Sequence, residues 1–312
     1  MGFDVVRLAT SHLTAASHLL AARHAAEHRL EPLLPALSID DARALVDGAL
    51  ARPGAVGWGA TTTDGDLAGF LIGAPSSAVA GVAPAVLVPA TGHAAAPDVI
   101  PALHAALTAR WRARDRHIQV GVHDAASRDV LTHLGFEPFL MIALAALPVV
   151  GTTVPSTVTI RQATIDDLAA LVMLARAQQA HHAAPPMSLP PPRGDESIRQ
   201  RRSLDDPRTG VWIAVDGRET LGMLVLQPPA AAFSPLHLPP ATIHLPDAIV
   251  LPTARGRGIG AALVAEAFGW VHAIGYRHVA LHVHAANTAA WRFWEARGFR
   301  AVAEQRVRRA RA

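Results

Sequence analysis

The sequence predicts an α/β protein made of two similar domains in tandem, each with a mixed β-sheet. Three observations lead to this fold class. The chain has 312 residues, a length typical of two domains. Apolar residues make up 51% of it, which is enough to form a core in each half. Strand-like runs alternate with long alanine-rich helical runs, and they do so in the same order in both halves.

An internal repeat carries the prediction of two domains. In each half, a short apolar strand and a similar tetrapeptide precede a long helical run, and an Asp-Gly turn then separates two strand-like runs, which indicates a β-hairpin. The matching positions are Arg7 and Arg161, Asp64-Gly65 and Asp216-Gly217, Gly69 and Gly222, Pro89 and Pro252, and Phe136 and Phe299. The last two pairs share an offset of 163 residues, so the region between them aligns without a gap.

The repeat places the domains at residues 1–148 and 156–312, with Gly151–Ser156 as the linker. Each half is expected to read strand, two helices, hairpin, strand, helix, strand, helix, strand. The last five elements of the second half are expected at 241–251, 258–274, 278–284, 287–297 and 299–307. The Pro-rich segments 185–192 and 228–240 are predicted to be loops.

Composition excludes several classes of function. The chain has no cysteine, which rules out disulfides, thiolate metal sites and a cysteine nucleophile. The net charge is only +3, so we predict no nucleic-acid partner. The arginines at 306, 308, 309 and 311 could touch an anion, but we interpret them as a solvated strand end and tail. No apolar run is long enough to cross a bilayer and no secretory signal is visible, so we expect a cytoplasmic protein without a membrane partner.

No metal site is predicted. Residues His24–His28 match the H-x-x-E-H pattern of some zinc proteases, but 17 histidines in the chain give such spacings by chance, and the segment falls where the repeat needs a helix. We interpret it as helix surface. His181-His182 is a lone pair beside a Pro-rich loop and has a weaker claim still. A homodimer is an arrangement that the sequence leaves open.

An anion-binding loop follows the apolar strand that ends at Val250-Leu251. Residues Arg255-Gly256-Arg257-Gly258-Ile259-Gly260 lead into a helix rich in alanine and leucine. Glycines let a ligand approach the backbone closely, and a helix N-terminus offers unpaired N–H groups and a partial positive charge. The two arginines add charge. The spacing is neither that of a Rossmann fingerprint nor that of a Walker loop, which needs a lysine that this chain lacks.

A second motif lies about 30 residues further on. The strand Leu281–His284 is followed by Asn287, Ala290, Phe293-Trp294 and Gly298-Phe299. Together, Arg-x-x-Gly-x-Gly opening a helix and Asn-x-x-Ala-x-x-aromatic-aromatic ending in Gly-Phe resemble the GNAT superfamily of acetyltransferases. The resemblance covers the second half of the chain. It implies two tandem GNAT-like acyl-CoA acyltransferase domains, at most of the architecture of mycothiol synthase, and acetyl-CoA as co-substrate.

The resemblance also implies roles for individual residues. The strand ending at Val250-Leu251 should splay from the strand at 278–284 and hold the pantetheine arm of acetyl-CoA. The N–H of Val250 would stabilise the oxyanion formed from the thioester. Residues 255–260 would bind the diphosphate. Asn287 would hydrogen-bond the arm, and Ala290 and Phe293 would line it.

The proton-transfer groups are less well specified. Some family members carry a glutamate eleven residues before the diphosphate loop, and that position is His244 here, with Asp247 as the next candidate base. His282 and His284, on one face of a strand, are further candidates. Where many members have a tyrosine acid, this chain has Trp294, whose indole does not titrate.

We therefore expect the second half to move an acetyl group directly to a small-molecule or peptide amine within a ternary complex. In the first half, the loop equivalent to 255–260 is Gly92–Pro97, which lacks both arginines, and Asp124 stands where Asn287 stands. This half is expected to lack an acetyl-CoA site. The alternative, favoured by Trp294, is a non-catalytic acyl-CoA sensor or interaction module.

Overall fold

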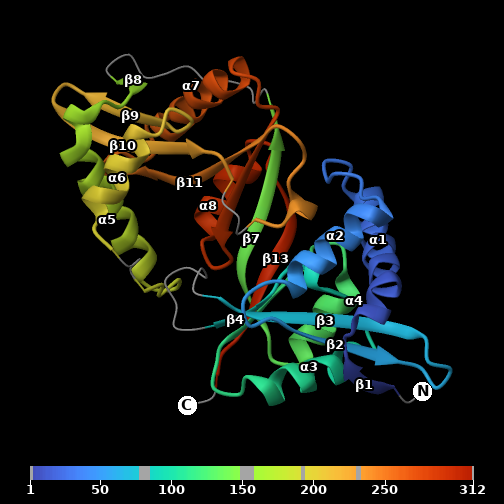
Figure 1. Ribbon diagram of the computed structural model, residues 1–312. Coiled ribbons are helices and arrows are strands. Elements are labelled where there is room, and N and C mark those ends of the chain that lie inside the picture. Colours follow the sequence, from blue (N-terminus) through green and yellow to red (C-terminus); the bar gives the residue numbers. More distant parts are fainter. Residues whose placement is uncertain (1–2, 77–84, 148–157, 191–193, 230–232, 311–312) are drawn as a thin grey trace. The chain divides into compact units, whose positions relative to one another are not determined.

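The computed structural model describes residues 3–76, 85–147, 158–190, 194–229 and 233–310 (Figure 1). The predicted linker 151–156 lies outside these ranges. The chain forms two compact units. Unit 1 consists of residues 1–142, 234–239 and 301–312, and unit 2 of residues 143–233 and 240–300. No helix in the described ranges combines the length and apolar composition needed to cross a membrane.

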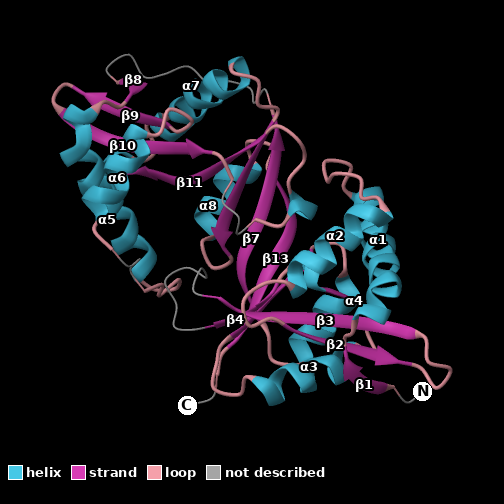
Figure 2. Ribbon diagram, viewed as in Figure 1, coloured by secondary structure: helices cyan, strands magenta, loops and turns pink. Residues whose placement is uncertain are grey.

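Unit 1 is a mixed sheet with helices packed against it (Figure 2). Its elements are β1 (Asp4–Arg7), α1 (Leu13–Leu30), α2 (Ile39–Leu50), β2 (Val56–Thr61), β3 (Leu67–Ser76), β4 (Ala85–Val88), β5 (His93–Ala95), α3 (Ile100–Arg110), β6 (Arg116–Gly121), α4 (Ala125–His133), the first part of β7 (Glu137–Ala146) and most of β13 (Arg300–Arg308). Strands β1 to β4 pair antiparallel in order, and β4 pairs with β6 in parallel.

Unit 2 repeats this order of elements. They are β8 (Thr159–Gln162), α5 (Leu168–Ala183), α6 (Glu196–Asp205), β9 (Gly210–Asp216), β10 (Glu219–Gln227), β11 (Thr242–Val250), α7 (Ile259–Ala273), β12 (His278–His284) and α8 (Thr288–Glu295). Strands β8 to β11 pair antiparallel in order, and β11 pairs with β12 in parallel. Apart from β5, the order of elements is the same in both units, as the repeat predicted, and the parallel pair β4–β6 of unit 1 corresponds to β11–β12 of unit 2.

The two units exchange their last strands. Residues 301–308 of β13 belong to unit 1, where they pair antiparallel with β6 from Ala303 opposite Gly121 to Arg308 opposite Arg116. The end of β7 belongs to unit 2, where Ala143 and Ala145 join the core formed by β12 and α7. The compact units therefore differ from the predicted linear domains 1–148 and 156–312. Periodicity shows that a strand exists, but backbone hydrogen bonding decides which sheet it joins.

Local signals explain where the helices of the site begin. Gly258, with φ of +77°, is the N-cap of α7 and has no side chain to satisfy the first N–H groups of that helix. Asn287 caps α8 by accepting a hydrogen bond from the N–H of Ala290, and its counterpart Asp124 caps α4 from Ser127 in the same way. The alignment of Asp124 with Asn287 thus reflects a shared structural position.

Candidate functional site

The parallel strands β11 and β12 separate in the middle of unit 2. Their pairing runs from Thr242 opposite His278 to Leu245 opposite Leu281 and then stops. Pro246, which has no N–H group, is the next residue of β11. Beyond it, β11 continues to pair with β10 on its other side, up to Val250 opposite Gly222. The separation leaves the edge of β11 that faces β12 open over its last residues.

The register fixes the direction of the Val250 backbone. The N–H of Leu251 donates to the carbonyl of Leu221 at 2.8 Å, which makes Gly222 and Val250 a non-hydrogen-bonded pair. The N–H and C=O groups of Val250 therefore point away from β10 and toward the open edge. Leu251 is placed differently from the prediction, because its N–H is used by Leu221 and its side chain packs with the core on the α5 side.

The predicted glycine loop ends at the N-terminus of α7. Gly256 and Gly258 both have φ of +77°, a conformation that favours glycine. The two arginines behave differently. Arg255 lines the pocket and donates from Nε to the Val250 carbonyl at 3.2 Å. Arg257 is outside the pocket lining, because its guanidinium forms an ion pair with Asp216 at 2.8 Å.

A pocket of about 490 Å³ fills the space between this loop, the open edge of β11 and α8. Its size is within the range of roughly 300–1,000 Å³ found for small-molecule sites. Most of the predicted cofactor residues contribute to its wall, namely Val250, Arg255, Gly256, Gly258, Ile259, Gly260, Asn287, Ala290 and Phe293. The sequence motifs therefore come together at one place, although they are about 30 residues apart.

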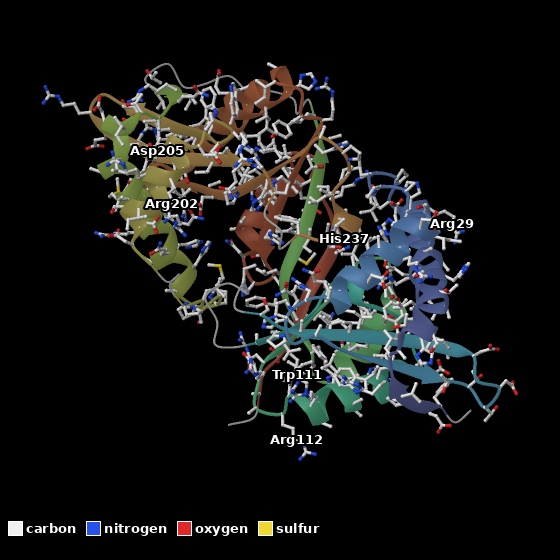
Figure 3. All side chains as sticks on the ribbon, viewed as in Figure 1. Arg29, Trp111, Arg112, Arg202, Asp205 and His237 are labelled. Carbon is white, nitrogen blue, oxygen red and sulfur yellow. The ribbon has the colours of Figure 1, made fainter. Side chains whose placement is uncertain are left out.

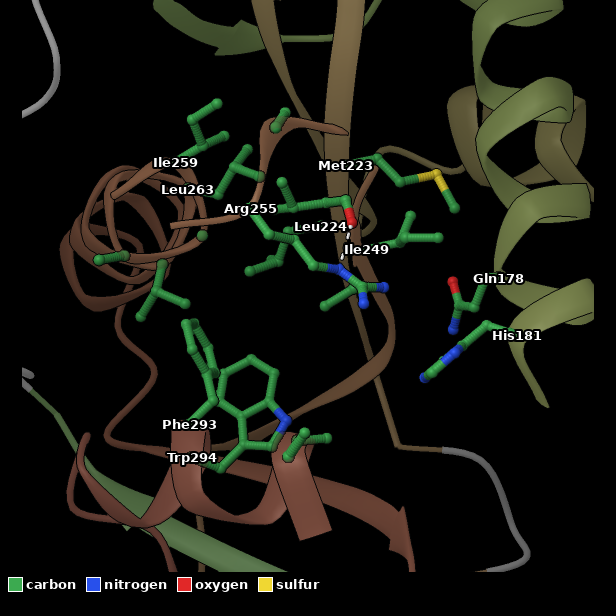
Figure 4. A pocket seen from close by; sticks show the side chains of 18 of the residues that line it. Gln178, His181, Met223, Leu224, Ile249, Arg255, Ile259, Leu263, Phe293 and Trp294 are labelled. Atoms are coloured by element: carbon green, nitrogen blue, oxygen red, sulfur yellow. Dashed lines mark hydrogen bonds between the residues drawn. The ribbon is translucent and has the colours of Figure 1, made fainter. Parts of the chain in front are cut away.

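Two aromatic side chains of α8 project into this pocket, opposite Ile259 and Leu263 of α7 (Figure 4). The Phe293 ring lies so close to Gly260 that a Cβ there would meet it at 3.1 Å, which explains the third glycine of the loop. Trp294 is 6% exposed and stands edge-on to Phe299 with ring centroids 5.2 Å apart. It lines the pocket at the position of the expected acid.

Arg297 was not anticipated from the sequence. It lines the same pocket, its guanidinium lies 3.5 Å from the centroid of the Phe293 ring, and Nη1 donates to the Phe293 carbonyl at 2.7 Å. Burial lowers the pKa of this guanidinium, which nevertheless keeps its charge at neutral pH. The spacing of four residues from Phe293, just past the end of α8, was the available signal.

Helix α5 contributes a polar wall that was also missed. Gln178, His181 and His182 all line the pocket, and Figure 4 shows Gln178 and His181 directed into it from α5. Their spacing of three and four residues puts them on one face of the helix. Gln178 donates from Nε2 to Oδ1 of Asp247 at 3.1 Å. Burial raises the pKa of Asp247 and lowers that of His182.

His244 lies on β11 but outside the pocket lining. It is 8% exposed, its ring is edge-on to Phe233 at 4.5 Å, and the ring of His282 is 5.8 Å away. Burial and the neighbouring His282 lower the pKa of His244 to about 3, and burial lowers that of His282 to about 4. Both imidazoles are therefore neutral at physiological pH. The assignment of His244 as a base stays a prediction.

The equivalent cleft in unit 1 is filled by side chains. Residues 93–95, which align with the glycine loop, form β5 and pair with β3. The His93 ring hydrogen-bonds to the Gln119 carbonyl on β6 at 2.6 Å, and Arg23 donates to the carbonyls of His93 at 2.5 Å and Ala90 at 2.7 Å. These contacts join the two sides of the cleft where β11 and β12 remain apart in unit 2.

The H-x-x-E-H segment belongs to this buried region. His24 is fully buried and Glu27 is 5% exposed, so the interpretation of the segment as helix surface was wrong. His24 instead hydrogen-bonds through Nε2 to the Pro35 carbonyl at 2.7 Å. Within the described ranges, no three His, Cys, Asp or Glu side chains are grouped as metal ligands. Glu27 on the same face lies against β6, where a Cβ on Gly121 would meet its carboxylate at 2.7 Å.

Comparison with known proteins agrees with this arrangement. Residues 174–299 match the model of the acetyltransferase (GNAT) family. The curated proteins include none that matches the sequence. A solved structure of a GCN5-related N-acetyltransferase from Sphaerobacter thermophilus is similar over 99% of this chain and 96% of its own, with 17% identity and a TM-score of 0.62.

Two further solved structures extend the comparison. A tandem GNAT protein from the clavulanic acid biosynthesis pathway aligns over 100% of this chain and 99% of its own, with 15% identity and a TM-score of 0.51. A GCN5-related glucosamine N-acetyltransferase region in a fungal multi-domain β-N-acetylglucosaminidase aligns over 98% of this chain and 38% of that chain, with 14% identity and a TM-score of 0.57. At these identities the likeness shows the fold, and it confirms the predicted α/β class and the tandem arrangement.

Proposed function

Because residues 174–299 match the model of the acetyltransferase (GNAT) family, we propose that unit 2 binds acetyl-CoA and transfers its acetyl group directly to an amine. The observation that carries the proposal is the contrast between the units. In unit 2 the separated strands open beside the glycine loop at the N-terminus of α7, whereas in unit 1 the same region is filled by Arg23 and His93. The acceptor is a small-molecule or peptide amine.

The residues of the pocket fit the two polar parts of acetyl-CoA. The N–H groups at the start of α7, together with Arg255, would hold the diphosphate. The open edge of β11 would hydrogen-bond the pantetheine arm, with Asn287 on the opposite side. The Val250 N–H, directed toward this edge, would stabilise the oxyanion, and such a donor is typically worth roughly 2.7–4 kcal/mol of the barrier.

We assign the removal of the amine proton to Asp247 ahead of His244. Asp247 receives one hydrogen bond, from Gln178, a residue of the pocket wall. Its raised pKa brings it closer to the working range of a general base. His244, with a pKa of about 3, is a weaker base. Neither side chain lines the pocket itself, but Asp247 is joined to the pocket wall through Gln178, whereas His244 packs against Phe233.

No tyrosine acid is required for departure of CoA. A free thiol has a pKa of roughly 8.5, so a thiolate leaves with help from one hydrogen bond or a water. The indole N–H of Trp294 can donate that bond without titrating. Since the chain has no cysteine, an acyl-cysteine intermediate is excluded, which favours direct transfer with both substrates bound together.

The decisive experiment measures thiol release from acetyl-CoA against a broad panel of amines, and in parallel the binding of acetyl-CoA by calorimetry. The proposal expects one binding site per chain and release of CoA with at least one class of amine. Two sites of comparable affinity would contradict the contrast between the units. One site without release from any amine would favour a non-catalytic acyl-CoA sensor instead.

A further inference from the structure

Unit 1 has an arginine-lined pocket that lies at the opposite end of β6 from its filled cleft. The pocket is formed where β6 begins, where β13 ends and where the chain leaves α3. Its polar side chains are Thr108, Arg112, Arg116, Glu137, Arg308 and Arg309. These residues are far apart in the sequence, and the antiparallel pairing of β13 with β6 brings the C-terminal arginines to this place.

Two of these arginines are a cross-strand pair. Arg308 stands directly opposite Arg116 in the register of β13 and β6, so both side chains leave the sheet on the same face. Like charges in directly opposite positions destabilise a sheet. Neither residue forms an ion pair in the described part of the chain. A pair of this kind is retained at a cost in stability unless an anion lies between the two guanidinium groups.

Arg116 is the more constrained of the two because it is 4% exposed. Its Nη1 group donates to the carbonyls of Trp111 at 3.3 Å and Arg112 at 3.4 Å, which end the turn after α3. Its Nε group has no hydrogen-bond partner. Burial and then the neighbouring Arg308 lower the pKa of Arg116. An unsatisfied, buried cationic N–H is costly, so this group points to a missing acceptor.

The pocket carries more positive than negative charge. Arg309 is neutralised by Asp115 at 2.9 Å, and Glu137 supplies one exposed carboxylate. Arg112 is exposed, extends away from the ribbon in Figure 3, and forms no ion pair in the described ranges. Four arginines therefore face two carboxylates, which leaves two positive charges without a counter-charge.

We propose that this pocket binds a small ligand that carries a phosphate monoester, held between Arg116 and Arg308. A phosphate monoester has a charge of about −1.5 to −2 at neutral pH, which matches the two uncompensated charges, whereas a carboxylate supplies only one. Its oxygens can accept the parallel N–H groups of a guanidinium fork. The hydroxyl of Thr108, which also lies 3.4 Å from Nε2 of His104, is at the rim of the pocket. This site is separate from the acyl-transfer pocket and does not depend on the proposed function.

The test uses the full chain and measures thermal unfolding in inorganic phosphate, in glycerol phosphate and in acetate, all at one ionic strength. Either phosphate should raise Tm by about 3 °C at ten times its dissociation constant, and acetate should not. The rise should persist in Gly258→Asp, which obstructs the anion loop of unit 2. In the Gly258→Asp background, the rise should disappear when Arg308→Gln is added and remain when Arg29→Gln is added. Arg29 is an exposed arginine of α1, so its change gives the same loss of charge.

Two further readouts separate binding from a structural role. Without phosphate, Arg308→Gln should unfold at the same or a higher temperature, because it removes a like-charge pair. Glu137→Gln should tighten phosphate binding about threefold. If Arg308→Gln does not fold, Arg112→Gln, which changes an exposed position, takes its place and should weaken phosphate binding. A phosphate effect that survives both arginine changes, or that Gly258→Asp abolishes, would overturn the proposal.

Discussion

Arg255 donates a hydrogen bond from Nε to the carbonyl oxygen of Val250 at 3.2 Å. The first arginine of the glycine loop is thus attached to the last residue of β11, whose N–H points toward the open edge of the strand. The bond joins the region proposed for the diphosphate to the region proposed for the thioester. A ligand that spans both would be held by two parts of the chain that already position one another.

Arg255→Gln should raise the dissociation constant of acetyl-CoA about tenfold, or ~1.4 kcal/mol, because it removes a charge that lines the pocket. Arg257→Gln is the matched control. Its charge is engaged by Asp216 outside the pocket, so the dissociation constant should change less than twofold. Isothermal titration calorimetry of both variants gives the comparison. Equal losses would mean that Arg257 leaves Asp216 to contact the ligand.

Asp247→Asn should lower kcat by roughly 10²–10⁴ and leave the acetyl-CoA dissociation constant unchanged, as expected for loss of a general base. A base acts in its deprotonated form, so kcat should rise with pH through the pKa of Asp247. Burial raises that pKa, and the rise should therefore occur above the usual aspartate range and disappear in the variant.

The His244→Ala variant tests whether His244, the second candidate, is the general base. A group with a pKa of about 3 stays deprotonated throughout ordinary assays and cannot produce a rising limb near neutrality. If His244 only packs against Phe233, the variant keeps the pH profile and loses less than threefold in kcat. A hundredfold loss of kcat in His244→Ala, together with an unchanged kcat in Asp247→Asn, would mean that His244 is the general base.

Trp294→Phe should be mild and cost about 1 kcal/mol in kcat if the indole N–H hydrogen-bonds the departing sulfur. Above the rise that comes from the base, the kcat profile should stay flat up to pH 10, because an indole does not ionise in that range. Tyr276 packs against the core of unit 2 rather than lining the pocket, so Tyr276→Phe should leave the profile as it is. A falling limb near pH 10 that Tyr276→Phe removes would contradict this.

Glu304→Gln should destabilise the protein by about 3–5 kcal/mol, because Glu304 on β13 is 2% exposed and pairs with Arg306 at 2.5 Å and Arg128 at 2.9 Å. Asp216→Asn also removes one partner of an ion pair, but that pair is about one third exposed and should contribute less than about 1 kcal/mol. Urea unfolding of the two variants measures the difference. Similar urea midpoints for the two variants would mean that the buried ion pairs of β13 add little to the stability of unit 1.

The sequence was sufficient to locate the glycine loop and the α8 motif, because glycines and caps act through local backbone geometry. Gly258 has the positive φ that favours glycine, and Asn287 caps α8, while its predicted hydrogen bond to the cofactor stays a prediction. Arg257 was misplaced because the direction of a long side chain depends on a neighbour, Asp216, that is 41 residues away. His181 could be assigned to a helix face, but which face meets β11 is decided by packing.

The exchanged final strands have a consequence for how such a chain can change during evolution. If a duplication produced the two halves, the second copy could keep its chemistry while the first lost its cleft, yet the first copy could not then be discarded. A deletion that ends near the linker would remove the part of β7 that completes the core of unit 2, and it would leave β13 without β6 as its edge partner. Even without a cofactor site of its own, the first half would therefore be needed, because the end of its last strand belongs to unit 2.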